Sequence, residues 1–234
     1  MTRVDPGSKP GNGPGPKPRS RARRPLSRER VLAAAIALAD GGGIDSLSMR
    51  KLAQALGVEA MTLYYWVANK DEIIDGILDL VLAEFRLPTD AADWKTELRA
   101  SILAAHEALE RHPWACQFLM SVRRLRPARL EFIDAVLRQL NRAGFSAELT
   151  DHAYHALDSH LLGSTLWEAG YTAGGVQAPQ EAQEALIRHV LATYPALGEH
   201  VEYHQRPRRE GEPRDFEFGL NLILDGVERL GAMA

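Results

Sequence analysis

Apolar residues recur at intervals of three and four along most of this chain, a spacing that places them on one face of an α-helix. No segment shows the strict alternation of apolar and polar residues that indicates a half-buried strand. The pattern therefore predicts an all-α protein. The expected helices run from Ser27 to the glycines at 41–43, and then over 48–56, 59–67, 70–87, 93–111, 114–122, 127–143, 147–169, 180–193 and 214–231.

Residues 48–70 have the form of two short helices joined by a tight turn. Leu52 and Leu56 lie four residues apart and share one face of the first helix. Gly57 follows directly, and glycine tolerates the positive φ that a sharp helix exit commonly needs. The second helix is expected over 59–67. This arrangement is typical of a helix-turn-helix, whose second helix can enter the major groove of DNA.

Three consecutive aromatic residues at positions 64–66 indicate that the second helix is a contact surface. Successive residues of a helix point about 100° apart, so a small domain cannot bury all three side chains. Asn69 is placed to cap the next helix, with Glu72 in the capping-box position. Lys70 then stands at the positive end of that helix, where a cation is disfavoured. A DNA phosphate would make a cation favourable at this position, because the helix end and the ammonium could both bind the phosphate.

The stretch LSMRKLAQALGVEAMTLYYWVANK, residues 47–70, resembles the DNA-binding motif of the tetracycline-repressor (TetR) family. The resemblance is strong over 27–75 and weaker over the C-terminal half, which looks closest to the tetracycline-repressor subgroup itself. It implies a cytoplasmic, small-molecule-responsive repressor that binds a palindromic operator as a homodimer. An alternative is a ligand-sequestering or protein-interaction domain that keeps the helix-turn-helix only as a scaffold. By resemblance, the residues that face DNA are Ser48, Arg50, Ala60, Met61, Thr62, Tyr64, Tyr65, Trp66 and Lys70.

Charge is distributed unevenly along the chain. Residues 1–25 carry a net charge of +6, so the remainder carries −9 within the total of −3. This first segment is rich in glycine and proline, which predicts a disordered basic arm that either contacts DNA or acts as a solubilising leader. Residues 26–72 are expected to form the helix-turn-helix domain. Residues 73–234 are expected to form a helical bundle for ligand binding and dimerisation, with helix 70–87 linking the two.

The last predicted helix carries apolar residues spaced four, three, four and three apart, which is typical of a coiled-coil seam. The helix predicted over 147–169 offers a matching apolar face. Two such helices from each of two subunits would form a four-helix dimer interface. A core within one chain would explain the spacing almost as well, and the resemblance favours the dimer. Its interface would comprise Leu157, Leu161, Phe216, Leu220, Ile223, Val227 and Leu230.

Titratable residues crowd one predicted helix, namely Asp151, His152, His155, Asp158 and His160. A metal or acid–base site there would need ligands from other elements, and the chain has no H-E-x-x-H, nucleophile-elbow or glycine-rich phosphate-loop motif. We therefore expect no catalytic residue, metal site or cofactor, and no enzyme. A lone cysteine, Cys116, excludes an intrachain disulfide. No apolar run approaches the ~20 residues of a membrane span.

A ligand pocket is the other use for such side chains, because a bundle lined by aromatic and histidine residues could hold a planar or amphipathic molecule. In the tetracycline-repressor subgroup a histidine and a glutamate help hold a magnesium–drug complex. The corresponding positions here are Leu119 and Trp167, with Glu168 adjacent, which argues against tetracycline with magnesium as the effector. The effector stays unidentified. The candidate pocket residues are His106, Trp114, Phe118, His155, Asp158 and Trp167.

A basic cluster surrounds Pro127 and consists of Arg123, Arg124, Arg126 and Arg129. We interpret it as a solvated turn between two helices, because charge clusters at helix junctions commonly face water. No chemistry is assigned to it.

Overall fold

The computed structural model of the protein describes residues 25–89, 93–121, 124–173, 180–206 and 214–233. Over these ranges it contains helices and no strand, so the predicted all-α class is confirmed. The predicted basic arm lies outside the described residues, except for its last residue. The elements are α1 (Arg28–Gly42), η1 (Ile44–Ser46), α2 (Met49–Leu56), α3 (Ala60–Leu63), α4 (Lys70–Leu82), α5 (Trp94–Arg111), η2 (Pro113–Ala115), α6 (Cys116–Leu119), α7 (Pro127–Arg142), α8 (Ala147–Ala173), α9 (Gln180–Thr193), α10 (Pro195–Gln205) and α11 (Asp215–Gly231).

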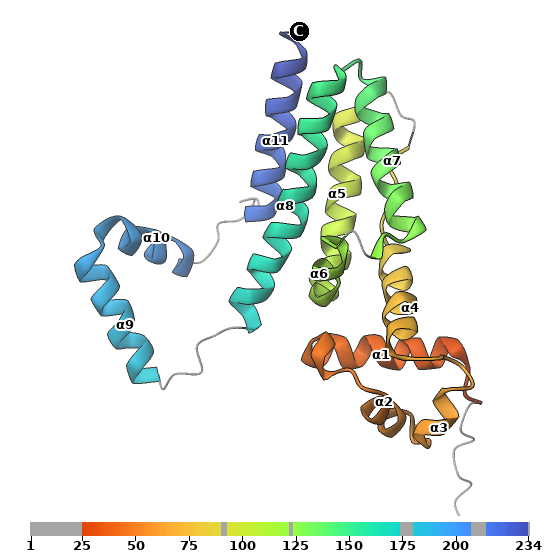
Figure 1. Ribbon diagram of the computed structural model, residues 1–234. Helices are drawn as coiled ribbons and strands as arrows, with labels where there is room; N and C mark the ends of the chain where they lie inside the picture. Colours follow the sequence, from red (N-terminus) through yellow and green to blue (C-terminus); the bar gives the residue numbers. More distant parts are fainter. Residues whose placement is uncertain (1–24, 90–92, 122–123, 174–179, 207–213, 234) are drawn as a thin grey trace, which may run out of the picture.

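The helices form a small domain and a larger body. α1, α2 and α3 lie together at one end of the molecule, and α4 leads from them into the body (Figure 1). There α5, α7, α8 and α11 run side by side, with α6 at the end nearer the small domain. None of the described helices has the length and apolar character that crossing a membrane requires.

Local signals fix the helix ends in the small domain. Ser27 and Ser48 precede α1 and α2, and each hydroxyl accepts a hydrogen bond from the backbone N–H three residues on, at 3.3 and 3.2 Å. Gly57 ends α2 in the left-handed conformation with φ of 66°. The N–H of Val58 then donates to the carbonyl of Ala53 at 3.0 Å, which fixes the turn. The predicted helix-turn-helix is confirmed in this form.

The second helix of the motif is shorter than the predicted 59–67. α3 covers four residues, and turns follow it. The N–H of Trp66 donates at 2.8 Å to the carbonyl of Leu63, three residues back rather than four, so the backbone tightens there. Leu63 and Val67 are buried in the core of the domain. They hold one side of the segment inward, which leaves its other side facing solvent.

α4 also ends earlier than predicted, at Leu82 instead of position 87. The N–H groups of Glu84 and Phe85 donate to carbonyls three residues back, at 3.1 Å, so tight turns replace the last helical turn. The ring of Phe85 still packs edge-on against that of Phe132 on α7, with centroids 5.2 Å apart. Because α4 contacts α1 as well as α7, it has a partner in the small domain and another in the body.

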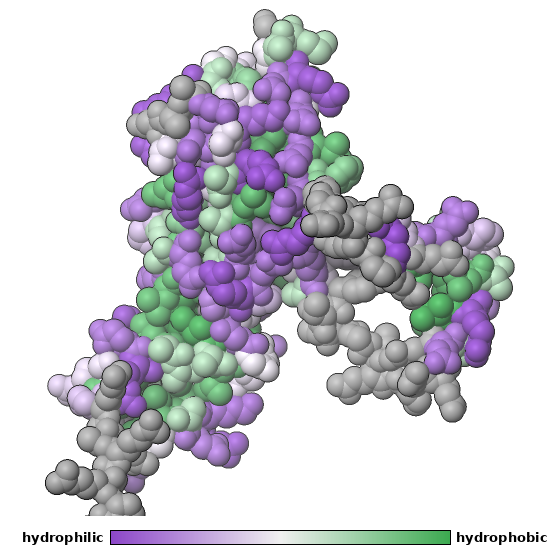
Figure 2. Space-filling model, turned by 180° about the vertical axis from the view of Figure 1, so that it is seen from behind, coloured by the Kyte–Doolittle hydropathy of each residue, from purple (hydrophilic) through white to green (hydrophobic). Residues whose placement is uncertain are grey.

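Two segments of the body differ from the prediction. The helix expected over 114–122 is a single 3-10 turn, η2, followed by the four residues of α6. α10 was not predicted, although Pro195 stands at its first position, where proline is already in the helical conformation. α9 and α10 pack on each other and extend away from the body (Figure 1). In the space-filling view this hairpin carries an apolar patch (Figure 2).

The apolar seam predicted for the dimer interface is instead a core within one chain. α11 packs along α8, and Phe216, Leu220 and Val227 are buried there with Leu157 and Leu161. Side chains buried in their own subunit offer no surface to a second one, so these five predictions are wrong. Ile223 is half-buried, and Leu230 is more than half exposed. The four–three spacing marks the inward face of α11 and does not identify the partner helix.

Candidate DNA interface and ligand site

The helix-turn-helix displays large side chains that its core does not use. Met61 is 76% exposed and Tyr65 is 83% exposed, although Leu63 between them is buried. Tyr64 is about half exposed, and the ring of Tyr65 meets that of Trp66 edge-on with centroids 5.0 Å apart. Large apolar side chains gathered on one short segment indicate a contact surface. The other residues predicted to face DNA also reach solvent, wholly or in part: Ser48, Arg50, Ala60, Thr62 and Lys70.

Lys70 lies at the first position of α4, where its Nζ donates a long hydrogen bond of 3.5 Å to the carbonyl of Ile44. The side chain of Asn69 caps the helix by accepting a hydrogen bond from the N–H of Glu72 at 2.8 Å, as predicted. The carboxylate of Glu72 accepts from the N–H of Ala68 at 2.7 Å, one residue before the N–H that a capping box would use. The start of α4 is therefore rigidly capped beside the Lys70 ammonium.

Three of the six predicted pocket residues are packed inside the body. His106 and Trp114 are buried, and Phe118 is partly buried. The indole N–H of Trp114 donates to the carboxylate of Asp40 at 2.7 Å, so this side chain joins the body to α1. This hydrogen bond gives the buried indole N–H the partner that it needs.

The other three predicted pocket residues lie elsewhere. Trp167 is exposed, and so is His155, whose Nε2 lies 3.6 Å from Asp151 on the same helix. Asp158 is ion-paired with the buried Arg129. The six residues therefore do not surround one pocket. Spacing along a helix could not reveal this, because it does not fix which face of α8 turns inward.

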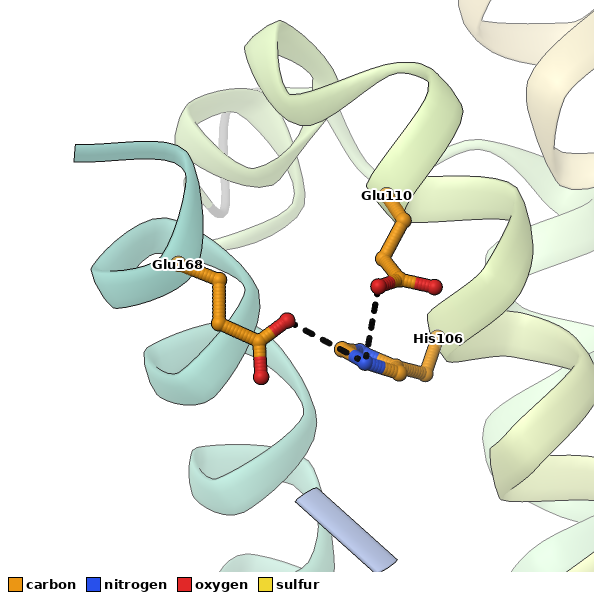
Figure 3. A group of neighbouring side chains, drawn as sticks. All are labelled: His106, Glu110 and Glu168. Carbon is orange, nitrogen blue, oxygen red and sulfur yellow. Dashed lines mark ion pairs between the residues drawn. The ribbon is translucent and has the colours of Figure 1, made fainter. Parts of the chain in front are cut away.

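A different set of polar side chains does converge at the edge of the body, where two partly exposed glutamates meet a buried histidine. His106 and Glu110 on α5 meet Glu168 on α8, and the three offer ligand atoms within 4.8 Å of one another (Figure 3). From the sequence we predict no metal site. Glu168 enters the sequence analysis only as the residue next to Trp167. Burial lowers the pKa of His106 to about 4, against the opposing effect of Glu110, so the ring is neutral near pH 7. The one sequence signal for this group was the His106–Glu110 spacing of four residues.

Hydrogen bonds join the small domain to the body at the start of η2. Nδ1 of His112 lies 2.8 Å from the Asp40 carboxylate, which also accepts from Trp114. On its other side, Nε2 of His112 lies 3.4 Å from Glu84, just beyond α4. The imidazole of His112 thus contacts a carboxylate on α1 and another just beyond α4. A movement of η2 would therefore be transmitted to both helices.

The basic cluster around Pro127 forms a second junction, so its interpretation as a solvated turn is wrong. Arg129 is buried and pairs with Asp158, while Arg123 lies outside the described residues. Nε of Arg126 donates a hydrogen bond of 2.8 Å to the carboxylate of Asp79 on α4, and this hydrogen bond raises the pKa of the guanidinium. Arg124 pairs with α4 as well. The α4 partners of Arg124 and Arg126 are Asp71, Asp75 and Asp79.

The sequence matches two family models. Residues 31–77 match bacterial regulatory proteins of the tetR family, and residues 87–230 match the tetracyclin repressor-like C-terminal domain. The chain belongs to the TetR family. As a member it is a DNA-binding, ligand-responsive transcriptional repressor, and transcriptional regulators of this family are not generally enzymes.

Named relatives agree with this assignment. The HTH-type transcriptional repressor DrrR1 of Streptomyces coeruleorubidus is 32% identical over 238 residues, which cover 97% of this TetR-family chain and 84% of that protein. The class D tetracycline repressor protein of Escherichia coli is 32% identical over 211 residues, covering 86% and 94%. The solved structure of a possible TetR family regulator from Streptomyces coelicolor A3(2) has a TM-score of 0.70 and 27% identity, covering 87% and 100%.

Proposed function

We propose that this repressor acts in the cytoplasm as a homodimer and binds a palindromic operator through α3 of each subunit. A small molecule bound in the C-terminal body would release it. The observation that carries the proposal is the outward face of α3 and of the turn after it, where Met61 and Tyr65 are more than three-quarters exposed beside a buried Leu63. A capped helix-turn-helix with such a face fits the major groove.

The proposed contacts divide by chemistry. Ala60 and Met61 offer only apolar groups, which suit the methyl groups of thymines, and Thr62 adds a hydroxyl. Arg50 and Lys70 supply positive charge to phosphates on either side of the groove. The remaining proposed contacts come from the cap of α2 and from the aromatic segment after α3, namely Ser48, Tyr64, Tyr65 and Trp66.

The proposed dimer uses the outward faces of α8 and α11 in place of the buried seam. On α11, Phe218 and Leu222 lie one turn apart and are both more than half exposed. On α8, the exposed Gly163 and Leu166 supply a small and an apolar residue at helical spacing. Since the two helices pack side by side (Figure 1), a second copy could complete a four-helix interface.

Release would pass through the two junctions between body and small domain. Asp40 on α1 is tied to η2, and α4 is tied to Arg124 and Arg126 at the start of α7. A ligand that shifts η2 or α7 would therefore turn α1 and α4. Because the two recognition helices must match grooves about 34 Å apart, a small rotation in each subunit would weaken binding.

The test is a gel shift of the full-length protein with DNA from upstream of its own gene. Tyr65→Ala and Lys70→Ala should each bind at least about tenfold more weakly than the wild type, and Lys70→Ala should also show a shallower salt dependence. The matched control is Tyr194→Ala, which removes an exposed tyrosine at the start of α10 and should bind like the wild type.

The alternative of a ligand-sequestering or protein-interaction domain predicts another result. The wild type would then bind this DNA no better than the Tyr65 and Lys70 variants at moderate salt, and the proposal would be rejected. The homodimer is tested separately by light scattering. Phe218→Glu with Leu222→Glu should halve the mass of the particle, because two charges from each subunit would enter the apolar interface.

A further inference from the structure

His106 is buried but has one ring nitrogen without a hydrogen-bond partner. Its side chain is 1% exposed, and among the described residues Nε2 makes no hydrogen bond. That nitrogen points toward two carboxylates, from Glu168 at 3.5 Å and from Glu110 at 3.8 Å (Figure 3). A buried polar atom without a partner is uncommon and needs a physical explanation.

The hydrogen bonds on the other side of the ring fix its tautomer. The hydroxyl of Thr165 donates to the carbonyl of Leu161 at 2.7 Å, so its oxygen has only lone pairs left for His106. Nδ1 of His106 lies 3.0 Å from that oxygen and must therefore carry the proton. In the neutral ring, Nε2 then presents a lone pair. This lone pair faces the two negatively charged groups, which is unfavourable unless a cation lies between them.

The surroundings hold this arrangement in place. The ring of Phe216 stacks on that of His106, with centroids 3.6 Å apart and planes 7° from parallel. The ring of His160 stacks on Phe216 at 4.7 Å, and its Nε2 bonds to the Phe216 carbonyl. Arg214 donates to both oxygens of Glu110, at 3.1 and 3.3 Å, and so offsets part of its charge. No hydrogen bond from Arg214 reaches Nε2 of His106.

We propose that His106, Glu110 and Glu168 bind one divalent transition-metal cation in each chain, with Zn²⁺ as the ion that suits them best. One imidazole nitrogen and two carboxylate oxygens are ligands that Zn²⁺ accepts, and small side-chain movements would bring them to the usual ~2.0–2.2 Å. The hydrogen bond from His106 to Thr165 is the kind of outer contact that orients a histidine ligand. Three protein ligands leave a fourth position open for water or for a donor atom of the effector.

The test is isothermal titration of the metal-stripped, tag-free full-length protein with Zn²⁺ near pH 7. The wild type should bind one equivalent per chain, raise its melting temperature with Zn²⁺, and show no comparable effect with Mg²⁺, which prefers all-oxygen sites. Glu168→Gln and His106→Gln should each weaken Zn²⁺ binding by more than tenfold. Thr165→Val should weaken it about 10–100-fold, because it removes only the outer contact.

The matched control is His155→Ala, which removes an exposed histidine–aspartate pair on the same α8. It should keep the stoichiometry and the affinity of the wild type. Circular dichroism on each variant separates lost binding from lost folding, and Glu168→Gln alters a partly exposed side chain, so its fold should persist.

Two outcomes would overturn the site. Either the wild type takes up no Zn²⁺ above the level of the His106→Gln protein, or the Zn²⁺ bound is lost with His155→Ala and kept with Glu168→Gln. In the first case the cluster binds no metal, and in the second the metal is held at the surface of α8. Because the titration contains no DNA, its result is independent of the gel shift that tests the proposed function.

Discussion

The DNA-binding end and the C-terminal body depart from ordinary burial in opposite directions. At the DNA-binding end, Met61 and Tyr65 carry large apolar surfaces into solvent. In the body, His106, Arg129 and Thr165 carry polar groups into the interior. Both departures cost free energy in the isolated chain, because apolar surface is hydrated in one and polar atoms are desolvated in the other. In each region the site that we propose lies at these exceptions to the usual burial of side chains.

The difference between the regions lies in what completes them. Met61 on α3 and Tyr65 in the turn after it stay more than three-quarters exposed, so the partner that we propose for them is an outside surface. The hydroxyl of Thr165 is satisfied within the chain by Leu161 and His106, and Arg129 pairs with Asp158 through Nη2. Among the described residues, three buried side-chain atoms have no hydrogen-bond partner, namely Oγ of Ser101, Nη1 of Arg129 and Nε2 of His106. Nε2 of His106 faces two carboxylates at 3.5 and 3.8 Å, so the partner that it implies is as small as an ion. The two ends thus differ in the size of ligand that their unsatisfied groups imply.

The largest effect on stability is expected from Phe216→Ala. This ring is buried between His106 and His160, so its removal leaves a cavity and should lower the free energy of unfolding by about 3–5 kcal/mol in urea denaturation. Phe216→Leu should recover part of the loss because it fills part of the space. If Phe216→Ala lowers the free energy of unfolding no more than the replacement of an exposed residue does, the body is not packed around this ring.

A smaller loss, about 1–3 kcal/mol, is expected from Asp40→Ala, because two donors lose their shared acceptor. The measurement is chemical denaturation together with the effect of the inducing ligand on DNA binding. The ligand effect should shrink, since one of the two junctions between body and small domain is cut. Asp45→Ala removes an exposed aspartate of η1 in the same domain and serves as control. If both variants behave alike, the junction at Asp40 carries no coupling.

At the corner of the helix-turn-helix, Gly57→Ala should cost about 1–2 kcal/mol, because φ of 66° strains a residue that has a Cβ. Gly57→Asn should cost less, since asparagine tolerates this conformation. Gly41→Ala in α1 is the matched control, where an added Cβ meets open space and helix propensity should give a gain of up to about 1 kcal/mol. Thermal melts of the three variants would show whether the order holds.

The smallest effect on stability is expected from Tyr65→Ala, which should leave the free energy of unfolding within about 0.5 kcal/mol of the wild type. The same variant should weaken operator binding. Tyr65→Ala should therefore lose DNA binding in the gel shift and keep its stability, whereas Phe216→Ala should lose stability. A large loss of stability would instead show that Tyr65 belongs to the core, and the comparison between the two regions would fail.

The sequence alone determined the DNA-binding end almost completely. Asn69 is predicted as a cap and Gly57 as the turn, and both act as predicted. Helices are predicted to begin at Ser27 and Ser48, and in the structure these two residues cap α1 and α2. Each of these features depends on hydrogen bonds between residues at most five positions apart. The predicted helices are longer than α3 and α4. After Leu63 and Leu82 the backbone N–H groups bond to carbonyls three residues back, and packing against the rest of the protein favours these tighter turns.

Only the tertiary structure decided the body. Periodicity found the inward face of α11 but could not distinguish a partner helix in the same chain from one in another. Thr165, which holds the ring of His106, lies 59 residues away from it. The pairs that join Arg124 and Arg126 to α4 also span neighbouring helices. Such contacts depend on how helices cross and which way each is turned, whereas caps and turns depend on neighbouring residues alone.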